Sequence, residues 1–121
     1  MTVIGLSKRK DKIDAIRLTL FDVPGRLDAV ECDIRDEAQV AAAFKWIEEV
    51  HGGVDLLINN AGVLAKGLLT DDNNTNELRK IIETNIIGLC LCTREAIKLM
   101  KKRETEDFGE NRGILFNWPK T

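Results

Sequence analysis

One segment decides the fold class of this chain: Val54-Asp55-Leu56-Leu57-Ile58-Asn59-Asn60-Ala61-Gly62, an apolar run that ends abruptly in polar and small residues. The mostly apolar Val54–Ile58 is typical of a strand that is buried on both faces of a parallel sheet. The asparagines and the glycine then lie at the carboxyl end of that strand. In open α/β sheets, ligands bind outside the carboxyl ends of the strands. The segment therefore predicts both the fold class and the edge of the sheet where a ligand would bind.

The rest of the chain alternates between strand-like and helix-like patterns. Short apolar stretches predict further strands over Thr2–Leu6, Arg26–Cys32 and Gly113–Asn117. Apolar residues at helical spacing predict helices over Lys8–Leu20, Glu37–Val50 and Glu77–Lys102. We expect Asp36 to cap the second of these helices, and either Thr75 or Asn76 to cap the third. Such alternation predicts a doubly wound α/β fold, with one parallel sheet, right-handed crossovers and helices on both faces.

Length and composition place the chain among ordinary globular domains. Its 121 residues suit a single domain over 1–121, and a net charge of −2 gives no reason to expect a nucleic-acid partner. The basic cluster at Lys8-Arg9-Lys10 is too short to change that expectation. No apolar run approaches the roughly 20 residues that a membrane-spanning helix needs. The amino terminus lacks the features of a signal peptide, so we expect a cytoplasmic protein.

The cysteines and the histidine give no sign of a metal site. Cys32, Cys90 and Cys92 are odd in number and badly spaced for metal ligands, so we expect reduced, partly buried thiols. His51 is the single histidine, and it precedes the Gly52-Gly53 pair at the predicted end of a helix. We expect it to be a surface residue. One histidine supports neither a Ser-His-Asp triad nor a multi-histidine metal centre.

Charged residues follow two of the predicted strands. Ser7-Lys8-Arg9 follows the first, where a basic residue in a dinucleotide fold would accommodate the 2′-phosphate of NADP. A guanidinium suits a phosphate because it can donate two parallel hydrogen bonds. The alternative is a solvated basic first turn of a helix. Asp33-Ile34 follows the next strand, where the aspartate could accept a hydrogen bond from an exocyclic amine such as that of adenine, or cap the following turn.

Amide side chains mark two further positions. Asn59-Asn60-Ala61-Gly62 combines donors and acceptors with residues that allow close backbone approach to a ligand, although a tight turn would use the same residues. Asn85 shares a predicted helix face with Ile81, Ile82 and Gly88. A buried amide must be hydrogen-bonded or it costs about 1–3 kcal/mol. Asn85 is therefore either a structural residue or part of a site.

At this point the chain resembles the short-chain dehydrogenase/reductase family. Four segments in the right order carry the resemblance: Lys8-Arg9, Asp33-Ile34, Asn59-Asn60-Ala61-Gly62 and Thr84-Asn85-Ile86-Ile87-Gly88. The sequence around these segments is most similar to that of insect members of the farnesol dehydrogenase-like kind. The resemblance extends to about Met100. It implies an NADP-dependent oxidoreductase of Rossmann fold that moves hydride between the cofactor and a small-molecule alcohol or carbonyl substrate.

The resemblance also implies roles for individual residues. Lys8 and Arg9 would hold the 2′-phosphate, and Asp33 and Ile34 would line the adenine pocket. The segment after the third strand would support the cofactor and the central sheet through Asn59, Ala61 and Gly62. Asn85 would match the family's catalytic asparagine, which holds a water in the proton relay.

The chain departs from the family pattern in three respects. The family begins with a strand and a glycine-rich turn that seats the pyrophosphate, but here Gly5 stands alone. The family's Tyr-x-x-x-Lys pair is absent, since the sequence contains no tyrosine. The family's serine would follow the last predicted strand, where Trp118 stands. We therefore expect a partial Rossmann-type sheet that lacks its first strand, weak NADP binding and no activity of this chain alone.

The expected strand order places that first strand between Thr2–Leu6 and Val54–Ile58. Three outcomes are open: these two strands pair directly, another chain fills the gap, or the isolated chain is poorly stable. The gap also supports an alternative function. The chain could be a non-catalytic binding or interaction module that pairs through open sheet edges, which a homo-oligomer would satisfy.

Overall fold

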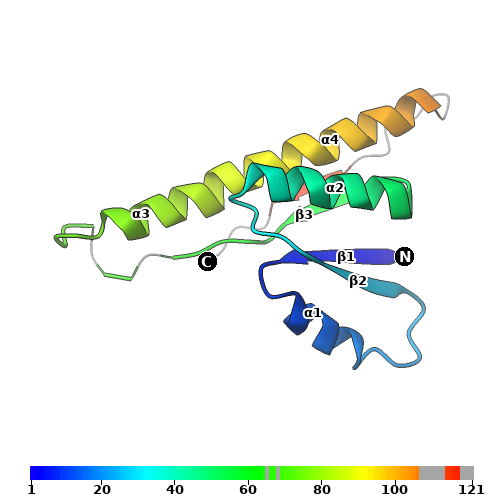
Figure 1. The fold of residues 1–121 in the computed structure, drawn as a ribbon, viewed down its shortest axis with the longest axis horizontal. Helices are drawn as coiled ribbons and strands as arrows, with labels where there is room; N and C mark the ends of the chain where they lie inside the picture. The colour runs from blue at the N-terminus through cyan, green and yellow to red at the C-terminus, as the bar shows by residue number, and fades with distance from the viewer. Residues whose placement is uncertain (65, 68, 107–113, 118–121) are drawn as a thin grey trace.

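The computed structural model describes residues 1–64, 66–67, 69–106 and 114–117, and within them strands and helices alternate as expected (Figure 1). The elements are β1 (Thr2–Ser7), α1 (Lys10–Arg17), β2 (Arg26–Glu31), α2 (Glu37–His51), β3 (Leu56–Asn59), α3 (Thr75–Ile82), the π-helix η1 (Glu83–Gly88), α4 (Leu89–Glu106) and β4 (Ile114–Asn117). Gly113, expected in the last strand, lies outside the described residues. The α/β class is confirmed.

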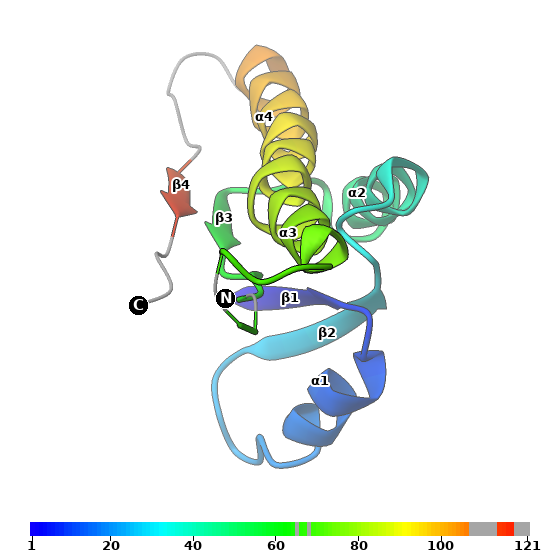
Figure 2. The ribbon, with the colours of Figure 1, turned by 90° about the vertical axis from the view of Figure 1, so that its left-hand side faces the viewer.

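The four strands form two parallel pairs. β1 pairs with β2, in register from Thr2 opposite Arg26 to Ser7 opposite Glu31. β3 pairs with β4 from Leu56 opposite Ile114 onward. Figure 2 shows α1 on one side of β1 and β2, and α2 and α4 on the other side. The parallel sheet with helices on both faces is therefore present, but only in part.

The two strand pairs do not join within the described residues, because β1 forms no ladder with β3. Direct pairing of these two strands, one of the three expected outcomes, is therefore wrong for this structure. The pairs are connected instead through a shared core under α2 and α4. Its buried residues come from the position after β2 and from the two helices: Cys32, Val40, Ala43, Phe44, Ile47, Cys92, Ala96 and Met100.

Sequence explains α2 closely. Asp36 is its N-cap, as expected, and its carboxylate accepts hydrogen bonds from the backbone N–H groups of Ala38 and Gln39 at 2.9 and 3.1 Å. Gly52 ends the helix with a left-handed φ of 75°, a conformation that glycine adopts without steric cost. The buried face repeats every three or four residues, which points it steadily at the core.

The long helix differs from its prediction at both ends and in the middle. It begins at Thr75 after Asn74, so neither Thr75 nor Asn76 is the cap. The Leu78 N–H donates to the Asn74 carbonyl at 3.1 Å, which places the first turn earlier than the apolar pattern suggests. Its final segment runs to Glu106. A π-helical turn, η1, interrupts it, and side-chain periodicity contains no signal for such a turn.

The prediction that the Val54–Ile58 strand is buried on both faces is wrong. The strand spans Leu56–Asn59, and its burial alternates: Leu57 packs against the core, whereas Leu56 and Ile58 are 45% and 56% exposed. Among the described residues, no element covers the face that carries these two side chains. Asp55 precedes the strand and forms an ion pair with Arg103 of α4 at 2.7 Å.

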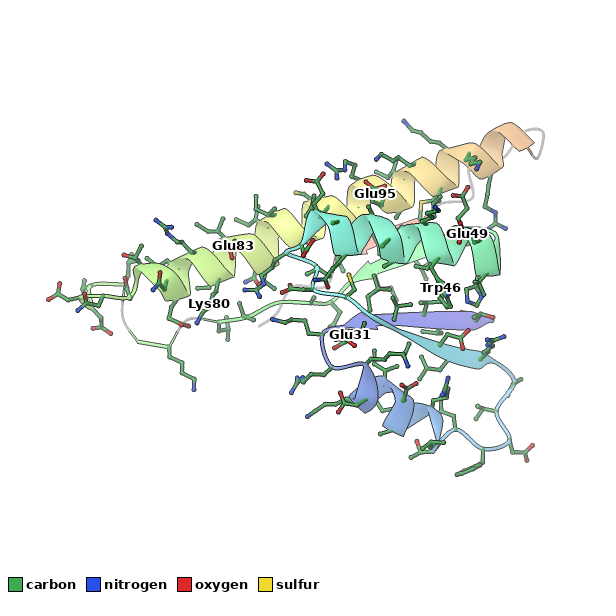
Figure 3. The ribbon with its side chains drawn as sticks, viewed as in Figure 1. Glu31, Trp46, Glu49, Lys80, Glu83 and Glu95 are labelled. Atoms are coloured by element: carbon green, nitrogen blue, oxygen red, sulfur yellow. The ribbon has the colours of Figure 1, made fainter. Side chains whose placement is uncertain are left out.

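Two further expectations need correction. The first helix is shorter than Lys8–Leu20, because the Arg9 N–H donates to the Ser7 hydroxyl in the preceding turn and the helix begins only at Lys10. His51 is not a surface residue, since its side chain is 13% exposed. It packs edge-on against Trp46, which Figure 3 shows between α2 and β1.

Candidate functional site

The carboxyl ends of β1 and β2 bring Lys8 and Asp33 together. The Lys8 ammonium lies 3.3 Å from Oδ2 of Asp33, although 25 residues separate the two in sequence. Parallel pairing causes this meeting, because Ser7 and Glu31 are aligned at the ends of the two strands. Lys8 is 61% exposed and Asp33 19% exposed, so the lysine is the more accessible of the two. Arg9 is also exposed, at the entrance to α1.

Asp33 forms its tightest contacts with Arg35. The Arg35 Nη2 lies 2.7 Å from Oδ2, and its Nε lies 3.0 Å from Oδ1. The backbone N–H of Arg35 also donates to Oδ1, at 3.1 Å. Asp33 therefore does cap the following turn, one of its two expected roles. The side-chain hydrogen bonds from Arg35, helped by Lys8, hold the pKa of this carboxyl well below its ordinary value.

Ile34 packs onto η1. A Cβ at Gly88 would lie 2.8 Å from the Ile34 Cδ1 and 3.1 Å from its carbonyl oxygen, so this approach needs a glycine. On the same side, Arg35 lies 3.9 Å from the Glu83 carboxylate, and Figure 3 shows Glu83 on the helical rod between α3 and α4. The turn after β2 therefore contacts both ends of the π-helical segment.

The segment after β3 is held to the same helical rod. The Asn59 amide donates to the Thr93 hydroxyl of α4 at 3.0 Å. Ala61 and Gly62 follow the strand without regular secondary structure, with Ala61 exposed and Gly62 half-buried. Their neighbour Val63 is clamped by Asn85: its N–H donates to the Asn85 Oδ1 and its carbonyl accepts from Nδ2, both at 2.8 Å.

The predicted site residues form two groups, and both groups contact the same stretch of helix. The residues after β1 and β2 form one group through Lys8 and Asp33, and the segment after β3 forms another. Both groups attach to η1 or the start of α4, and Asn85 lies within η1 itself. The double hydrogen bond of Asn85 to Val63 confirms a structural role, one of the two that the sequence left open.

Sequence reasoning missed Arg35 and Thr93. Arg35 follows Asp33 by two residues, the spacing at which an aspartate side chain bonds a backbone N–H, and that spacing could have identified the turn. Thr93 lies 34 residues after its partner Asn59, and no local pattern reveals such a contact.

Other features of the described surface do not involve the predicted site residues. A hollow of about 280 Å³ lies between α2 and α4, and none of its lining residues belongs to the predicted site. Within the described ranges, no group of three or more His, Cys, Asp or Glu side chains could hold a metal ion. The same part of the chain contains no helix that is long and apolar enough to cross a membrane. The three cysteines are free thiols, with Cys32 and Cys92 buried and Cys90 exposed.

Parallel strands with interleaved helices, and charged and amide groups at the carboxyl ends, define a partial Rossmann-type α/β domain. Solved structures agree. ElxO with NADP bound superposes with a TM-score of 0.76 at 30% identity, over 95% of this chain and 44% of that one. A short-chain dehydrogenase from Streptomyces avermitilis gives a TM-score of 0.78 at 27% identity, over 96% and 39%.

Sequence comparison defines the family. The model of the short chain dehydrogenase family matches residues 1–107, and the chain belongs to that family of oxidoreductases. A farnesol dehydrogenase of Aedes aegypti is 40% identical over 107 residues, which cover 88% of this chain and 44% of that protein. Dehydrogenase/reductase SDR family member 11 of Gallus gallus is 36% identical over 109 residues, covering 88% and 42%. The chain thus spans less than half the length of the curated relatives it matches.

Proposed function

We propose that this chain forms the NADP-binding half of an oxidoreductase that transfers hydride between the cofactor and a small-molecule alcohol or carbonyl substrate. One observation carries the cofactor proposal: Lys8, an exposed cation, lies at the carboxyl end of β1 beside the Asp33 carboxylate. A 2′-phosphate requires a cation at this position of a dinucleotide fold. The NADP bound to ElxO supports this choice by analogy.

The residues divide into those that bind and those that position. Lys8 and Arg9 would bind the 2′-phosphate, while Asp33 and Ile34 would contact the adenine. The segment with Asn59, Ala61 and Gly62 would support the cofactor along β3. NADP supplies the hydride chemistry when it is bound.

Asn85 is proposed as the residue that holds a water in the proton relay. Its side-chain amide is committed to Val63 through both of its ends. A primary amide has a second N–H and a second lone pair, so it can still bind a water. The proposal thus places a relay water on a side chain whose orientation is already fixed by the backbone it clamps.

The substrate class follows from relatives alone. The Aedes aegypti protein is named a farnesol dehydrogenase, and farnesol is an alcohol. This supports an alcohol or its carbonyl product as the substrate of the whole protein. The chain spans less than half of that relative, so the particular alcohol is not proposed.

The adenosine half of the cofactor provides the test, because its proposed contacts all lie in this chain. Titration calorimetry would compare adenosine 2′,5′-bisphosphate with AMP on the full 121-residue chain. We expect tighter binding of the bisphosphate, and a clearly smaller preference in Lys8→Gln, which retains Arg9. An exposed cation elsewhere, Lys45→Gln, is the matched control. Equal binding of the two probes by the unsubstituted chain would overturn the NADP proposal.

We also propose that the chain alone does not turn over substrate. The family's general acid is a tyrosine, and the sequence contains none. We expect no NADPH oxidation with an aldehyde or ketone substrate above the level without protein. Turnover that disappears in Asn85→Ala would contradict this proposal.

A second candidate function rests on the open strands. Within the described residues β3 pairs only with β4, and such an edge strand can pair with another chain. Leu56 and Ile58 also expose about half of their surfaces on β3. The chain would then be a non-catalytic module whose partner is a second copy of itself. Sedimentation velocity at several concentrations distinguishes the two states: a dimer that Ile58→Lys dissociates favours the module, and a monomer at all concentrations opposes it.

The free cysteines support the proposal of a cytoplasmic location. Three unpaired cysteines are typical of a reducing compartment. Fractionation of cells that express the protein would test it, and recovery in the secreted fraction would contradict it.

A further inference from the structure

Arg35 has no part in the proposed function, yet it makes the closest contacts that Asp33 has. Its planar guanidinium reaches both carboxylate oxygens, with Nη2 2.7 Å from Oδ2 and Nε 3.0 Å from Oδ1. Such a fork is the strong form of an ion pair, because two hydrogen bonds share one rigid geometry. Arg35 is also the more sheltered partner, at 31% exposure against 61% for Lys8.

Lys8 and Arg35 meet at the same oxygen. The Lys8 ammonium lies 3.3 Å from Oδ2, whereas the Arg35 Nη2 lies 2.7 Å from it. A long contact from a well-exposed lysine is the kind of ion pair that contributes little to stability. Asp33 is therefore already neutralised by Arg35, and Lys8 can leave it at small cost.

Glu83 holds Arg35 from the other side. Its carboxylate lies 3.9 Å from the Arg35 Nη1, so the guanidinium is placed between two acids, one after β2 and one at the start of η1. Arg35 has no resolved contact with Lys8. Because the Arg35 guanidinium lies between these two carboxylates, we expect it to stay beside Asp33 when a ligand binds.

We propose that Arg35 is a positioning residue, which keeps Asp33 occupied and thereby leaves the Lys8 ammonium free to bind the 2′-phosphate of NADP. Without Arg35, the Asp33 carboxylate beside Lys8 would lose its main counter-charge, and it would compete with the phosphate for the ammonium. Asp33 would remain an anion at neutral pH without Arg35, because an ordinary aspartate titrates at about pH 4. The inference rests on the proposed function.

The test measures a ratio of affinities on the full chain. The probes are adenosine 2′,5′-bisphosphate and AMP, titrated at one fixed ionic strength, because salt screens exposed charges. We expect Arg35→Gln to lower the preference for the bisphosphate by about threefold to tenfold, which is the lower part of the usual range of coupling between contacting residues. Arg35→Lys keeps the charge and loses the paired hydrogen bonds, so its preference should lie between that of Arg35→Gln and that of the unsubstituted chain. A ratio is insensitive to an unfolded fraction, which weakens both probes alike.

A double-mutant cycle with Lys8 separates positioning from direct contact. In a Lys8→Gln background there is no ammonium to release, so Arg35→Gln should cause no further loss of preference. The matched control is Arg17→Gln, which removes an exposed arginine whose partner is Asp14, at 3.3 Å. Its preference should equal that of the unsubstituted chain.

The outcomes separate this inference from the function beneath it. If the unsubstituted chain prefers the bisphosphate but Arg35→Gln leaves the ratio unchanged, the positioning role is wrong and the NADP proposal stands. A further loss in the Lys8→Gln background also overturns the positioning role, because Arg35 would then contact the phosphate itself. If the unsubstituted chain shows no preference, the NADP proposal fails and this inference fails with it.

Discussion

Asp33 shows how one side chain can serve structure and recognition together. Its carboxylate closes the turn after β2 by accepting a hydrogen bond from the Arg35 N–H, and it also forms an ion pair with Lys8 at the end of β1. The backbone N–H of Arg35 uses only one of the acceptor sites of the carboxylate, and the Arg35 side chain and Lys8 occupy the others. A hydrogen bond from adenine, which stays a proposal, would take the place of the long Lys8 contact on Oδ2.

The ion pairs of Asp33 predict a pH dependence of stability. Its pKa is lower in the folded chain than in the unfolded chain, where an aspartate titrates near pH 4. The stabilisation is therefore complete above about pH 4 and is lost as the pH falls through the lower folded value. Asp33→Asn should be less stable than the unsubstituted chain at pH 6, and the difference should shrink below about pH 4.

Urea unfolding across this range measures the effect. Asp72→Asn, which removes an exposed carboxylate, is the control and should follow the unsubstituted chain at every pH. A stability difference for Asp33→Asn that stays constant down to about pH 2 would contradict the assignment.

Asn85 gives a second prediction at the residue scale. Replacement by alanine removes two hydrogen bonds to the backbone of Val63, each with a net contribution of about 0.5–1.5 kcal/mol, so the free energy of unfolding should fall by about 1–3 kcal/mol. Asn76→Ala, an exposed position in α3, should change it by less than about 0.5 kcal/mol. Chemical denaturation compares the two variants, and equal stability of both would show that the clamp contributes nothing.

The π-helical segment η1 is the element on which the candidate site is built. The turn after β2 contacts it through Ile34 and Arg35, and the loop after β3 through Val63. A π turn rotates the following residues relative to an ordinary helix, which fits the frequent occurrence of such turns at functional sites. Its place between α3 and α4 brings Asn85 to Val63, in the loop that follows β3.

Gly88 predicts how tightly this element must fit. An alanine there would place its Cβ within 3.1 Å of the Ile34 carbonyl oxygen, a backbone atom that cannot move aside as a side chain can. Overpacking of this kind typically costs about 1–3 kcal/mol. Thermal unfolding should therefore show a clear loss for Gly88→Ala. Cys90→Ala, at an exposed position of α4, should show little change, and a fully stable Gly88→Ala would show that the approach is looser than described.

The sequence predicts elements well where local rules decide them. α2 agrees at both ends because a capping aspartate and a terminal glycine determine them, and β1 and β2 agree within a residue. It fails where distant parts of the chain decide. The face of β3 with Leu56 and Ile58 is exposed because no described element covers it, and η1 depends on contacts with segments more than 20 residues away. The partners of the site residues are equally non-local, apart from Arg35.

At the scale of the whole molecule, two separate strand pairs depend on one core. Phe44 and Ile47 of α2 pack with Ala96 and Met100 of α4, while β1 and β3 reach the same cluster from different pairs. Exposed ion pairs also join the helices: Arg94 lies 2.6 Å from Glu37, and Lys102 contacts Glu48. The core therefore replaces the backbone ladder that β1 and β3 do not share.

This shared core predicts cooperative loss of both strand pairs. Phe44→Ala should cost about 3–5 kcal/mol, a large part of the stability of an ordinary domain. Hydrogen exchange should then show β2 and β3 losing protection together, because one cluster supports both. Lys45→Ala, the exposed neighbour on α2, is the control. Loss of protection in one strand pair alone would mean that the two halves fold independently.

The central claim is that the carboxyl ends of β1 and β2 form the adenosine side of a nucleotide site. Chemical-shift mapping of the ¹⁵N-labelled chain with adenosine 2′,5′-bisphosphate tests it most directly, since it reports binding residue by residue. We predict saturable shifts centred on Lys8, Arg9, Asp33 and Ile34, with smaller ones spreading to η1. Shifts centred on the hollow between α2 and α4, or no shifts at saturating ligand, would contradict the account.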